Sequence, residues 1–370
     1  MFPAFGVGEG FSALGLSSGS VRSIFQLTYG KVESIAIHSP LPFGALSRTP
    51  EDLMSDDKFR LVTRSDFDGL VCAVLLRELG MIDDVMFVHP KDMQDGKIAI
   101  TGRDITTNLP YVAAAHLVFD HHVSEIERFE HAKDRWTQDR SNQVMDASAP
   151  SAARVVYQHF GAKARFPGIS DEMMKAVDQA DSAHYGRADI LAPRGWTLLN
   201  FVMDPRTGLG RFRDFRISNY QLMMELIEYC RNHAIDEILA LPDVKERVDL
   251  YWDQNYAFIE QLERCSHLEG NVVIVDLRAQ DPIYAGNRFM IYALYPTATV
   301  SIHLIKGHDD LNTVLAVGKS IVNRRSLAHI GSIMLDFGGG GHDAAGTCQV
   351  DKNRSIAMLE KIVKRINAAG

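Results

Sequence analysis

Short apolar runs alternate with longer amphipathic stretches between residues 60 and 181. The apolar runs are too short for helices, so they predict buried strands at 60–63, 85–88, 98–100 and 117–119. Helices are expected at 70–79, 152–160 and 171–181, with Gly80 ending the first and Ser151 and Ser170 capping the other two. Strands that alternate with helices are typical of a doubly wound parallel sheet of the α/β class.

The pattern changes after residue 220. Residues 220–240 and 243–266 are predicted to be helical and are separated by Pro242. The second helix is polar on much of its surface, as expected of a connector between two domains. A new α/β pattern begins at Asn271, with strands expected at 272–275, 298–304 and 314–317 and helices near 326–336 and 354–367. We predict an α/β domain at 54–241, a helical connector at 242–268 and a smaller α/β domain at 269–370.

The first 53 residues differ from the rest of the chain. They are rich in Gly, Ser and Pro, and their first positive charge is Arg22, which is not typical of a signal peptide. Met54 begins the segment that leads into the first strand. We interpret residues 1–53 as a disordered extension or a misassigned start.

Composition limits the function classes. The 370 residues are 46% hydrophobic and carry a net charge of −8, which argues against a broad nucleic-acid-coating surface but permits a small basic pocket. Four scattered cysteines without a CxxC pair argue against a zinc ribbon or a disulfide framework and favour a reducing cytoplasm. The sequence contains no run of 18 apolar residues, so no membrane span is expected. A homodimer is compatible with these data but not indicated by them.

The triplet Asp120-His121-His122 follows the apolar run 117–119 at the carboxyl end of a predicted strand. Ligand sites of open α/β sheets lie at this edge. Carboxylate and imidazole side chains together suit Mn, Zn, Fe or Co better than Ca. By itself the triplet is also compatible with a polar surface segment, so the metal hypothesis depends on further ligands.

Further carboxylates precede and follow the triplet. Asp66 and Asp68, at i and i+2 of an extended segment, face the same side and repel one another unless a cation lies between them. A polar loop with a helix-capping Asp is the alternative. Asp104 lies just past the predicted third strand. Asp181 lies near the end of a predicted helix, where Asp178 competes with it.

A glycine run near the carboxyl terminus predicts an anion site. Four consecutive glycines have no evident packing use, yet they let backbone N–H groups approach a phosphate closely. A flexible linker is disfavoured because small apolar residues and a strand follow at once. His342 would donate to a phosphate oxygen, Arg288 could clamp a phosphate bidentately, and Lys319 is a weaker candidate. The substrate-binding glycines are Gly339, Gly340 and Gly341.

In this order, the motifs between about Arg60 and Val350 resemble the DHH phosphoesterase superfamily with its C-terminal DHH-associated domain. The resemblance rests on Asp66-x-Asp68-Gly69, on the triplet at 120–122 and on the glycine motif at 339–346. It implies a dinuclear Mn²⁺ centre that hydrolyses phosphoester or phosphoanhydride bonds. By the resemblance, Asp66 would bind one metal and Asp68 the other, and Asp120 or Asp104 would bridge the two. His121 and Asp181 would complete the second metal site. His122 would contact the scissile phosphate.

The chain departs from the family pattern at one point. Many members carry a histidine ligand before the first Asp, where this chain has Val62 and Arg64. Neither side chain can serve as that ligand. The first metal is therefore expected to bind weakly, to take a water in place of the missing ligand, or to be absent. Arg64 becomes a candidate for binding a substrate phosphate.

The acidic chain lacks the basic groove expected of a processive nuclease. We therefore predict an Mn-dependent phosphoesterase in which two metals activate water against a small phosphorylated substrate, either a short oligonucleotide or a nucleoside bisphosphate. One alternative is an exopolyphosphatase-like hydrolase. Another is a non-catalytic module that binds a phospho-ligand and has an incomplete metal site.

Overall fold

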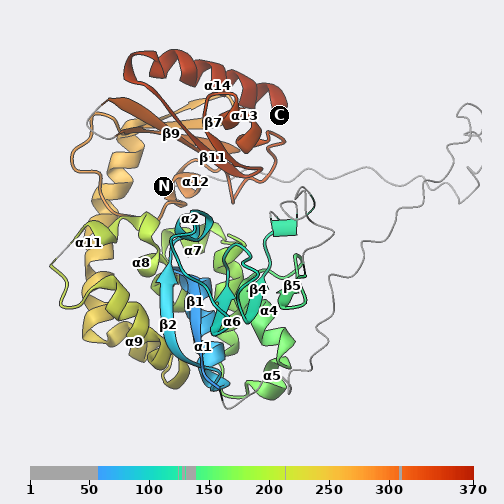
Figure 1. The fold of residues 1–370 in the computed structure, drawn as a ribbon. Helices are drawn as coiled ribbons and strands as arrows, with labels where there is room; N and C mark the ends of the chain where they lie inside the picture. Colours follow the sequence, from blue (N-terminus) through green and yellow to red (C-terminus); the bar gives the residue numbers. More distant parts are fainter. Residues whose placement is uncertain (1–56, 124, 127–129, 131–138, 213, 308–310) are drawn as a thin grey trace, which may run out of the picture. The chain divides into compact units, whose positions relative to one another are not determined.

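The computed structural model of the protein describes residues 57–123, 125–126, 130, 139–212, 214–307 and 311–370 (Figure 1). The predictions for residues 1–53 and for a start at Met54 lie outside these residues. In the part of the chain that is described, no helix is both long and apolar enough to cross a membrane. Two β-sheets organise this part of the chain.

The first sheet has five parallel strands in the order β2-β1-β3-β4-β5, which confirms the predicted parallel α/β architecture. Helices α1 (Phe67–Glu78), α4 (Ala152–His159) and α6 (Asp171–Asp181) pack with the strands and with one another (Figure 1). The strands are β1 (Phe59–Arg64), β2 (Ile82–Val88), β3 (Asp104–Thr107), β4 (Leu117–Asp120) and β5 (Gln143–Met145).

The third strand is not where the sequence predicted it. Residues 98–100 are not a strand, and β3 begins at Asp104. Ile98 and Ile100 instead pack against a small apolar cluster that includes Val62. Asp104 therefore opens the strand rather than following it, and it pairs with Arg60 at the amino end of β1.

The predicted helix signals near the first sheet are confirmed. Ser151 and Ser170 accept hydrogen bonds from backbone N–H groups three residues later, at 3.0 and 3.2 Å. Gly80 ends α1 with a φ of 67°, a left-handed conformation that favours glycine. Helix α1 begins at Phe67, earlier than predicted. Ten of its twelve residues are buried, so it has no clear polar face from which the sequence pattern could indicate its first turn.

Helices follow the first sheet. The predicted helix at 220–240 is divided where residues 233 and 234 adopt an extended conformation. Pro242 occupies the first turn of α11, where a missing N–H costs nothing. The helical elements of this region are α7 (Arg187–Leu191), α8 (Gly195–Met203), η1 (Pro205–Thr207), η2 (Leu209–Arg211), α9 (Asn219–Asn232), α10 (Ile235–Ala240) and α11 (Pro242–Cys265); the short helices α2 (Pro90–Gln94) and α5 (Ala162–Arg165) come earlier.

The second sheet has six strands in the order β10-β11-β9-β8-β7-β6, and only β7 and β8 are parallel. Helices α13 (Ile330–Leu335) and α14 (Ser355–Ala369) pack against it (Figure 1). Its strands are β6 (Ser266–Glu269), β7 (Val272–Asp276), β8 (Val300–Lys306), β9 (Asn312–Lys319), β10 (Gly340–His342) and β11 (Ala345–Asp351); α12 (Met290–Leu294) and η4 (Lys352–Arg354) complete the elements. The domain boundaries at 242–268 stay a prediction.

Candidate metal and phosphate site

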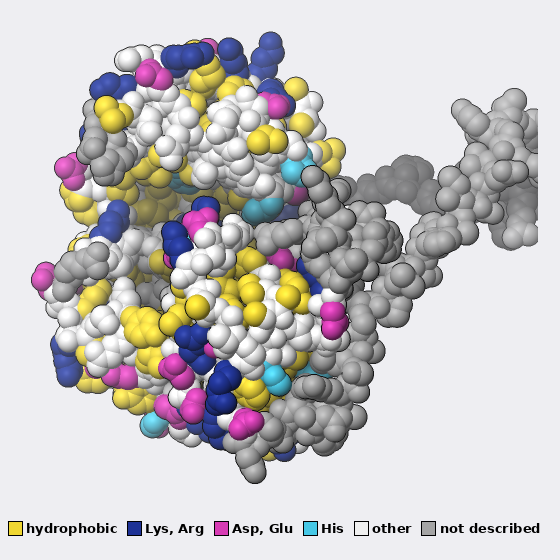
Figure 2. Space-filling model, viewed as in Figure 1, with side chains coloured by type: hydrophobic (Ala, Val, Ile, Leu, Met, Phe, Trp, Pro, Cys, Tyr) yellow, Lys and Arg dark blue, Asp and Glu magenta, His cyan; other side chains and the backbone are white. Residues whose placement is uncertain are grey.

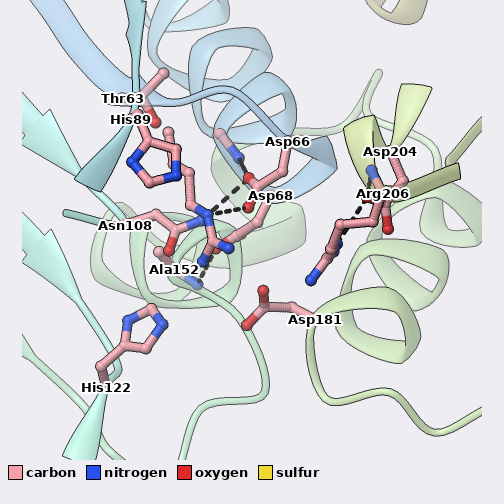
Figure 3. A network of polar contacts seen from close by, with 12 residues as sticks. Thr63, Asp66, Asp68, His89, Asn108, His122, Ala152, Asp181, Asp204 and Arg206 are labelled. Atoms are coloured by element: carbon pink, nitrogen blue, oxygen red, sulfur yellow. Dashed lines mark hydrogen bonds and ion pairs between the residues drawn. The ribbon is translucent and has the colours of Figure 1, made fainter. Parts of the chain in front are cut away.

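The order of strands in the first sheet reverses between β1 and β3. At such a switch point the connections leave in opposite directions, and a crevice opens beyond the carboxyl ends of the strands. Asp66 and Asp68 follow β1, Asn108 follows β3, and Asp120 ends β4 (Figure 3). Of the predicted carboxylates, Asp66, Asp68 and Asp120 therefore lie at the edge of the sheet that favours ligand binding.

Asp68, His121 and Asp181 form the centre of this crevice. Their ligand atoms all lie within 4.8 Å of one another. The carboxylate of Asp68 is 2% exposed and accepts hydrogen bonds from the N–H groups of Ala152 at 3.0 Å and Ala153 at 2.8 Å, at the start of α4. The three residues are called the metal cluster below.

The tautomer of His121 follows from its partner. Its Nδ1 lies 3.1 Å from the carbonyl oxygen of Ala149, which can only accept, so Nδ1 carries a proton. Nε2 is then the nitrogen that can coordinate a cation, and it lies 2.9 Å from Oδ2 of Asp181. A backbone carbonyl that fixes the ring in this way is typical of histidine metal ligands.

Electrostatics mark the cluster as a cation site. Burial raises the pKa of Asp68 to about 8, and the charges of Asp181 and Asp66 contribute to the rise. Burial lowers the pKa of His121, but the hydrogen bond to Asp181 and the charge of Asp68 outweigh it and bring the pKa to about 9. Without a cation, Asp68 and His121 thus retain protons up to high pH. A bound divalent ion would compensate the negative charge of the carboxylates in place of these protons.

The position expected for the first metal is arranged differently. Oδ2 of Asp66 lies 2.9 Å from Nε of Arg64, and its Oδ1 accepts from the N–H of Gly69 at 3.0 Å and from Nδ2 of Asn108 at 3.2 Å. Val62 is fully buried in an apolar cluster and cannot reach a metal. Around Asp66, N–H donors and a guanidinium therefore stand where a second cation would need oxygen and imidazole ligands.

Asp120 and His122 form a second carboxylate–imidazole pair beside the cluster. Oδ1 of Asp120 lies 2.7 Å from Nδ1 of His122. Burial lowers the pKa of His122, but the hydrogen bond to Asp120 raises it above its ordinary value overall. Oδ2 of Asp120 and Oδ1 of Asn108 are buried without a hydrogen-bond partner in the described chain. Buried oxygens without a partner are expected to bind an ion or a water. These two oxygens are therefore compatible with a cation nearby.

Two predicted carboxylates lie elsewhere. Asp104 accepts from Nε of Arg60 at 2.7 Å and from the N–H of Thr101 at 2.7 Å, at the amino end of β3. Asp104 opens β3, and Thr107 ends this strand three residues later, about 10 Å away at 3.3 Å per residue, which corrects the prediction of Asp104 as a metal ligand. Asp178 bonds to Ser151 and Arg154. Asp181, not Asp178, thus belongs to the cluster.

Two arginines line the same pocket as Asp66 and the two carboxylates of the metal cluster. Arg288 is among the predicted phosphate ligands, and its Nε lies 3.6 Å from Oδ2 of Asp204. Oδ1 of Asp204 accepts from the backbone N–H of Arg206 at 2.8 Å and from its Nε at 2.7 Å (Figure 3). Burial and the charge of Arg206 lower the pKa of Arg288 to about 10. The two guanidiniums thus place positive charge beside the carboxylates of the cluster.

Besides Asn108, three residues near the pocket are not among those predicted from the sequence. Arg206 and its partner Asp204 lie in the turn that follows α8, and an Asp-Pro-Arg turn after a helix is a weak signal by itself. His89 follows β2 and lies near Asn108 in Figure 3, with Nδ1 accepting from the N–H of Lys91 at 3.1 Å. Its only signal is its position directly after a predicted strand.

The glycine run has a packing use, contrary to the expectation from the sequence. A Cβ at Gly339 would lie 2.0 Å from the carbonyl oxygen of Thr347, and one at Gly341 would lie 2.2 Å from that of Ala345. Both glycines let β10 approach β11 closely. Only Gly340 of the three has open space where a Cβ would stand.

His342 is exposed in β10, and its Nδ1 accepts from the N–H of Ala344 at 3.3 Å. Within the described ranges, no hydrogen bond or ion pair joins it to the metal cluster. Lys319 is paired with Asp343 at 2.8 Å. The substrate-binding role of the glycine run and His342 thus stays a prediction.

Comparison with known proteins defines the class. No family model and no curated protein matches the chain. Among solved structures it is similar to a pGpG-specific phosphodiesterase from Vibrio cholerae, with 55% identity and a TM-score of 0.76 over 85% of this chain and 100% of that chain. Matches with a TM-score of 0.47 include the DHH domain of a member of the S1p family of ribosomal proteins, with 11% identity over 86% of this chain and 89% of that one. Another is RecJ from Thermus thermophilus in complex with Mn²⁺, with 16% identity over 85% of this chain and 53% of that one.

The sequence and the fold of the chain are those of a phosphoesterase. The chain belongs to the DHH phosphoesterase superfamily.

Proposed function

We propose that the protein hydrolyses the phosphodiester bond of a short guanine dinucleotide of the pGpG type with the help of one divalent cation. The observation that carries this proposal is the 55% identity over the full length of the Vibrio cholerae pGpG-specific phosphodiesterase. The pocket supports it, because two arginines and two carboxylates of the candidate cation site line the same small space. A dinucleotide brings one phosphodiester to that space and needs no long basic groove.

The metal cluster fits one resident cation. Asp68, His121 and Asp181 offer two carboxylates and an imidazole, a donor set that suits Mn²⁺. When bound, the cation would lower the pKa of a coordinated water and neutralise phosphate oxygens. We place no second cation at Asp66, because the guanidinium of Arg64 already supplies positive charge there.

The side chains around the cluster divide the remaining work. Arg206 and Arg288 bind the phosphate oxygens, and Asp204 holds both guanidiniums in place. His122 carries a proton more readily than an ordinary histidine and can donate it to the leaving oxygen. Asp120 orients that imidazole, as a carboxylate does in many acid–base pairs.

The second sheet would hold the rest of the substrate. Gly340 has open space where a Cβ would stand, and the exposed His342 lies two residues further on. In this proposal they contact the phosphate that is not cleaved, together with the neighbouring glycines.

A substrate panel tests the proposal. Hydrolysis of pGpG with Mn²⁺ is followed by chromatography of the GMP product, alongside 3′-phosphoadenosine 5′-phosphate, a cyclic dinucleotide and polyphosphate. We expect pGpG to be cleaved fastest and Asp68→Asn to abolish cleavage. Asp104→Asn is the matched control, since it changes an equally buried carboxylate outside the cluster. An unimpaired Asp68→Asn would reject the centre, and a preference for polyphosphate would favour the exopolyphosphatase alternative.

Metal counting tests the single cation separately. Equilibrium dialysis against Mn²⁺ followed by elemental analysis should give one Mn per chain for the wild type. The double variant Arg64→Ala/Asn108→Asp removes the guanidinium and places a carboxylate after β3, so its stoichiometry should rise. Two Mn per wild-type chain would contradict the one-cation site without affecting the choice of substrate.

A further inference from the structure

A hollow of about 850 Å³ lies beside α11 and the second sheet, and its lining is strongly basic. Among the described residues that line it, Asp276 is the only carboxylate. The cations are Arg264, Arg278, Lys306 and Lys352. Four positive charges and one negative charge leave a local charge of +3 in a chain whose net charge is −8.

The basic hollow is remote from the glycine run. Lys306 and Thr313 pair with one another at one end of the β8–β9 ladder, and both line the hollow. Gly318, at the opposite end of β9, pairs with Ala345 beside the glycine run. The seven residues of β8 span about 20 Å at roughly 3.3 Å per residue. None of the metal-cluster residues lines the hollow.

Its central arginine is fixed in place. Nε and Nη2 of Arg278 bond to the two carboxylate oxygens of Asp276 at 2.9 and 2.6 Å, and Nη1 donates to Oγ of Ser355 at 2.9 Å. Ser355 opens the 15-residue helix α14, whose first turn adds partial positive charge. The guanidinium is thus held without help from a ligand, and this preorganisation lowers the entropic cost of binding one.

A second arginine of the lining is also held in place. Arg264 donates to Oε1 of Gln280 at 3.1 Å, which fixes its guanidinium at the edge of the same hollow. Two guanidiniums fixed by neighbouring side chains suit an anionic ligand that accepts charge-assisted hydrogen bonds.

We propose that the basic hollow is a second binding site, for a small ligand with clustered phosphate groups. The charge excess exceeds what one carboxylate needs and suits several phosphates close together. Among the described residues that line the hollow there is no phenylalanine, tyrosine or tryptophan, and His267 is the only aromatic ring, so the lining favours phosphate groups over bases. The site therefore reads the phosphates and not the nucleoside, and inorganic tripolyphosphate should bind as well as a nucleoside triphosphate.

Calorimetric titration with tripolyphosphate in EDTA tests this site. The variant Arg264→Glu/Lys306→Glu reverses two exposed charges of the hollow. Its matched control is Lys361→Glu/Lys364→Glu, which makes the same charge change on the exposed, Lys-rich surface of α14 (Figure 2). We expect the hollow variant to bind about 100-fold more weakly, since each lost charge-assisted hydrogen bond accounts for about tenfold or more. The control should stay within about threefold, because exposed charges outside the hollow are screened.

Further arms separate the sources of binding. GTP should bind to the wild type with the same affinity as tripolyphosphate. Arg288→Ala, which alters the pocket beside the metal cluster, should leave this affinity unchanged. Thermal unfolding of the hollow variant should match that of the control, and any pGpG hydrolysis shown by the wild type should be retained.

The proposal is overturned by any of four results: no tripolyphosphate binding to the wild type, equal loss in the α14 control, loss in Arg288→Ala, or binding of GTP without tripolyphosphate. Each of these leaves the pGpG assay untouched. Failure of the second site is therefore distinguishable from failure of the proposed catalytic function.

Discussion

Replacing Asp181 with Asn tests the electrostatics of the metal cluster most directly. The substitution keeps the size of the side chain but removes the charge that lies 2.9 Å from Nε2 of His121. Both side chains are mostly buried, at 12% and 17% exposure, so solvent screens their interaction weakly. In the metal-free protein, the proton on His121 should therefore depend strongly on this carboxylate.

The expected size follows from the pKa of His121. It stands at about 9 in the metal-free protein, above an ordinary value of 6.5. Asp68 remains beside the imidazole in the variant, so we expect most of the rise, but not all of it, to disappear. A fall of about 2 units corresponds to about 2.7 kcal/mol of interaction between His121 and Asp181. Titration of the imidazole followed by NMR measures it.

The same interaction predicts how stability depends on pH. Because folding raises the pKa of His121, the pair stabilises the metal-free wild type fully below about pH 6.5. That stability is lost as the pH rises through about 9. Asp68 adds a loss that begins at lower pH. Because folding raises its pKa from 3.8 to about 8, its contribution to stability declines from about pH 3.8 and is gone above about pH 8, where it ionises next to Asp181.

Urea unfolding in EDTA at pH 6 and at pH 9.5 checks this sign. At pH 6 the variant should be less stable than the wild type by about 2.7 kcal/mol. At pH 9.5 the difference should vanish or reverse, because the variant lacks the repulsion between two ionised carboxylates. An equal difference at both pH values would refute the electrostatic account and leave only a packing effect of the amide.

Three other predictions follow from the same geometry. Asp104→Ala should leave Mn²⁺ binding unchanged in dialysis but lower the free energy of unfolding by about 1–3 kcal/mol, because Arg60 loses its partner. In thermal denaturation, Gly341→Ala should destabilise the protein strongly, while Gly340→Ala should change stability by less than about 0.5 kcal/mol, since only the former clashes with backbone. Mn²⁺ affinity should rise from pH 6 to pH 9, because the cation displaces protons from Asp68 and His121. Calorimetry in buffers of different ionisation enthalpy counts the protons that are released on binding. Binding without proton release would contradict the raised pKa values.

The central part of the site could be predicted because its residues follow strong local patterns. The triplet comes directly after an apolar run, and the Asp-x-Asp-Gly segment comes directly after another. Because parallel strands place their carboxyl ends at one edge, these segments had to meet. The sequence predicts Asp181 as a ligand, with Asp178 as a competitor one helical turn away. Only the packing of α6 against α4 shows that Asp178 accepts a hydrogen bond from Arg154.

The third strand shows where the pattern misleads. Residues 98–100 are apolar but cover a small cluster beside the sheet. The true strand carries Thr106 and Thr107, which are polar yet fully buried. The hydroxyl of Thr107 lies 2.7 Å from that of Thr63 on the neighbouring strand, a partner that no local pattern can supply. The error in the strand then carried Asp104 into the predicted site.

The arginine pair could be predicted only in part, because its geometry is made by distant segments. Only the bidentate chemistry of its guanidinium predicts Arg288 as a phosphate ligand. Arg206 comes from a turn more than 80 residues earlier, and Asp204 joins the two. Nothing in the spacing of these residues indicates that they meet. Ion pairs between loops depend on how whole helices pack, which is the least local property of a fold.

The bonds from the backbone of Ala152 and Ala153 to Asp68 have a consequence for how the enzyme matures. Because main-chain N–H groups hold this ligand, a newly made chain can complete its fold before any cation arrives. Loading then becomes a separate, reversible event. Removing the cation would then leave a folded chain in which Asp68 is still held by the backbone and can be loaded again.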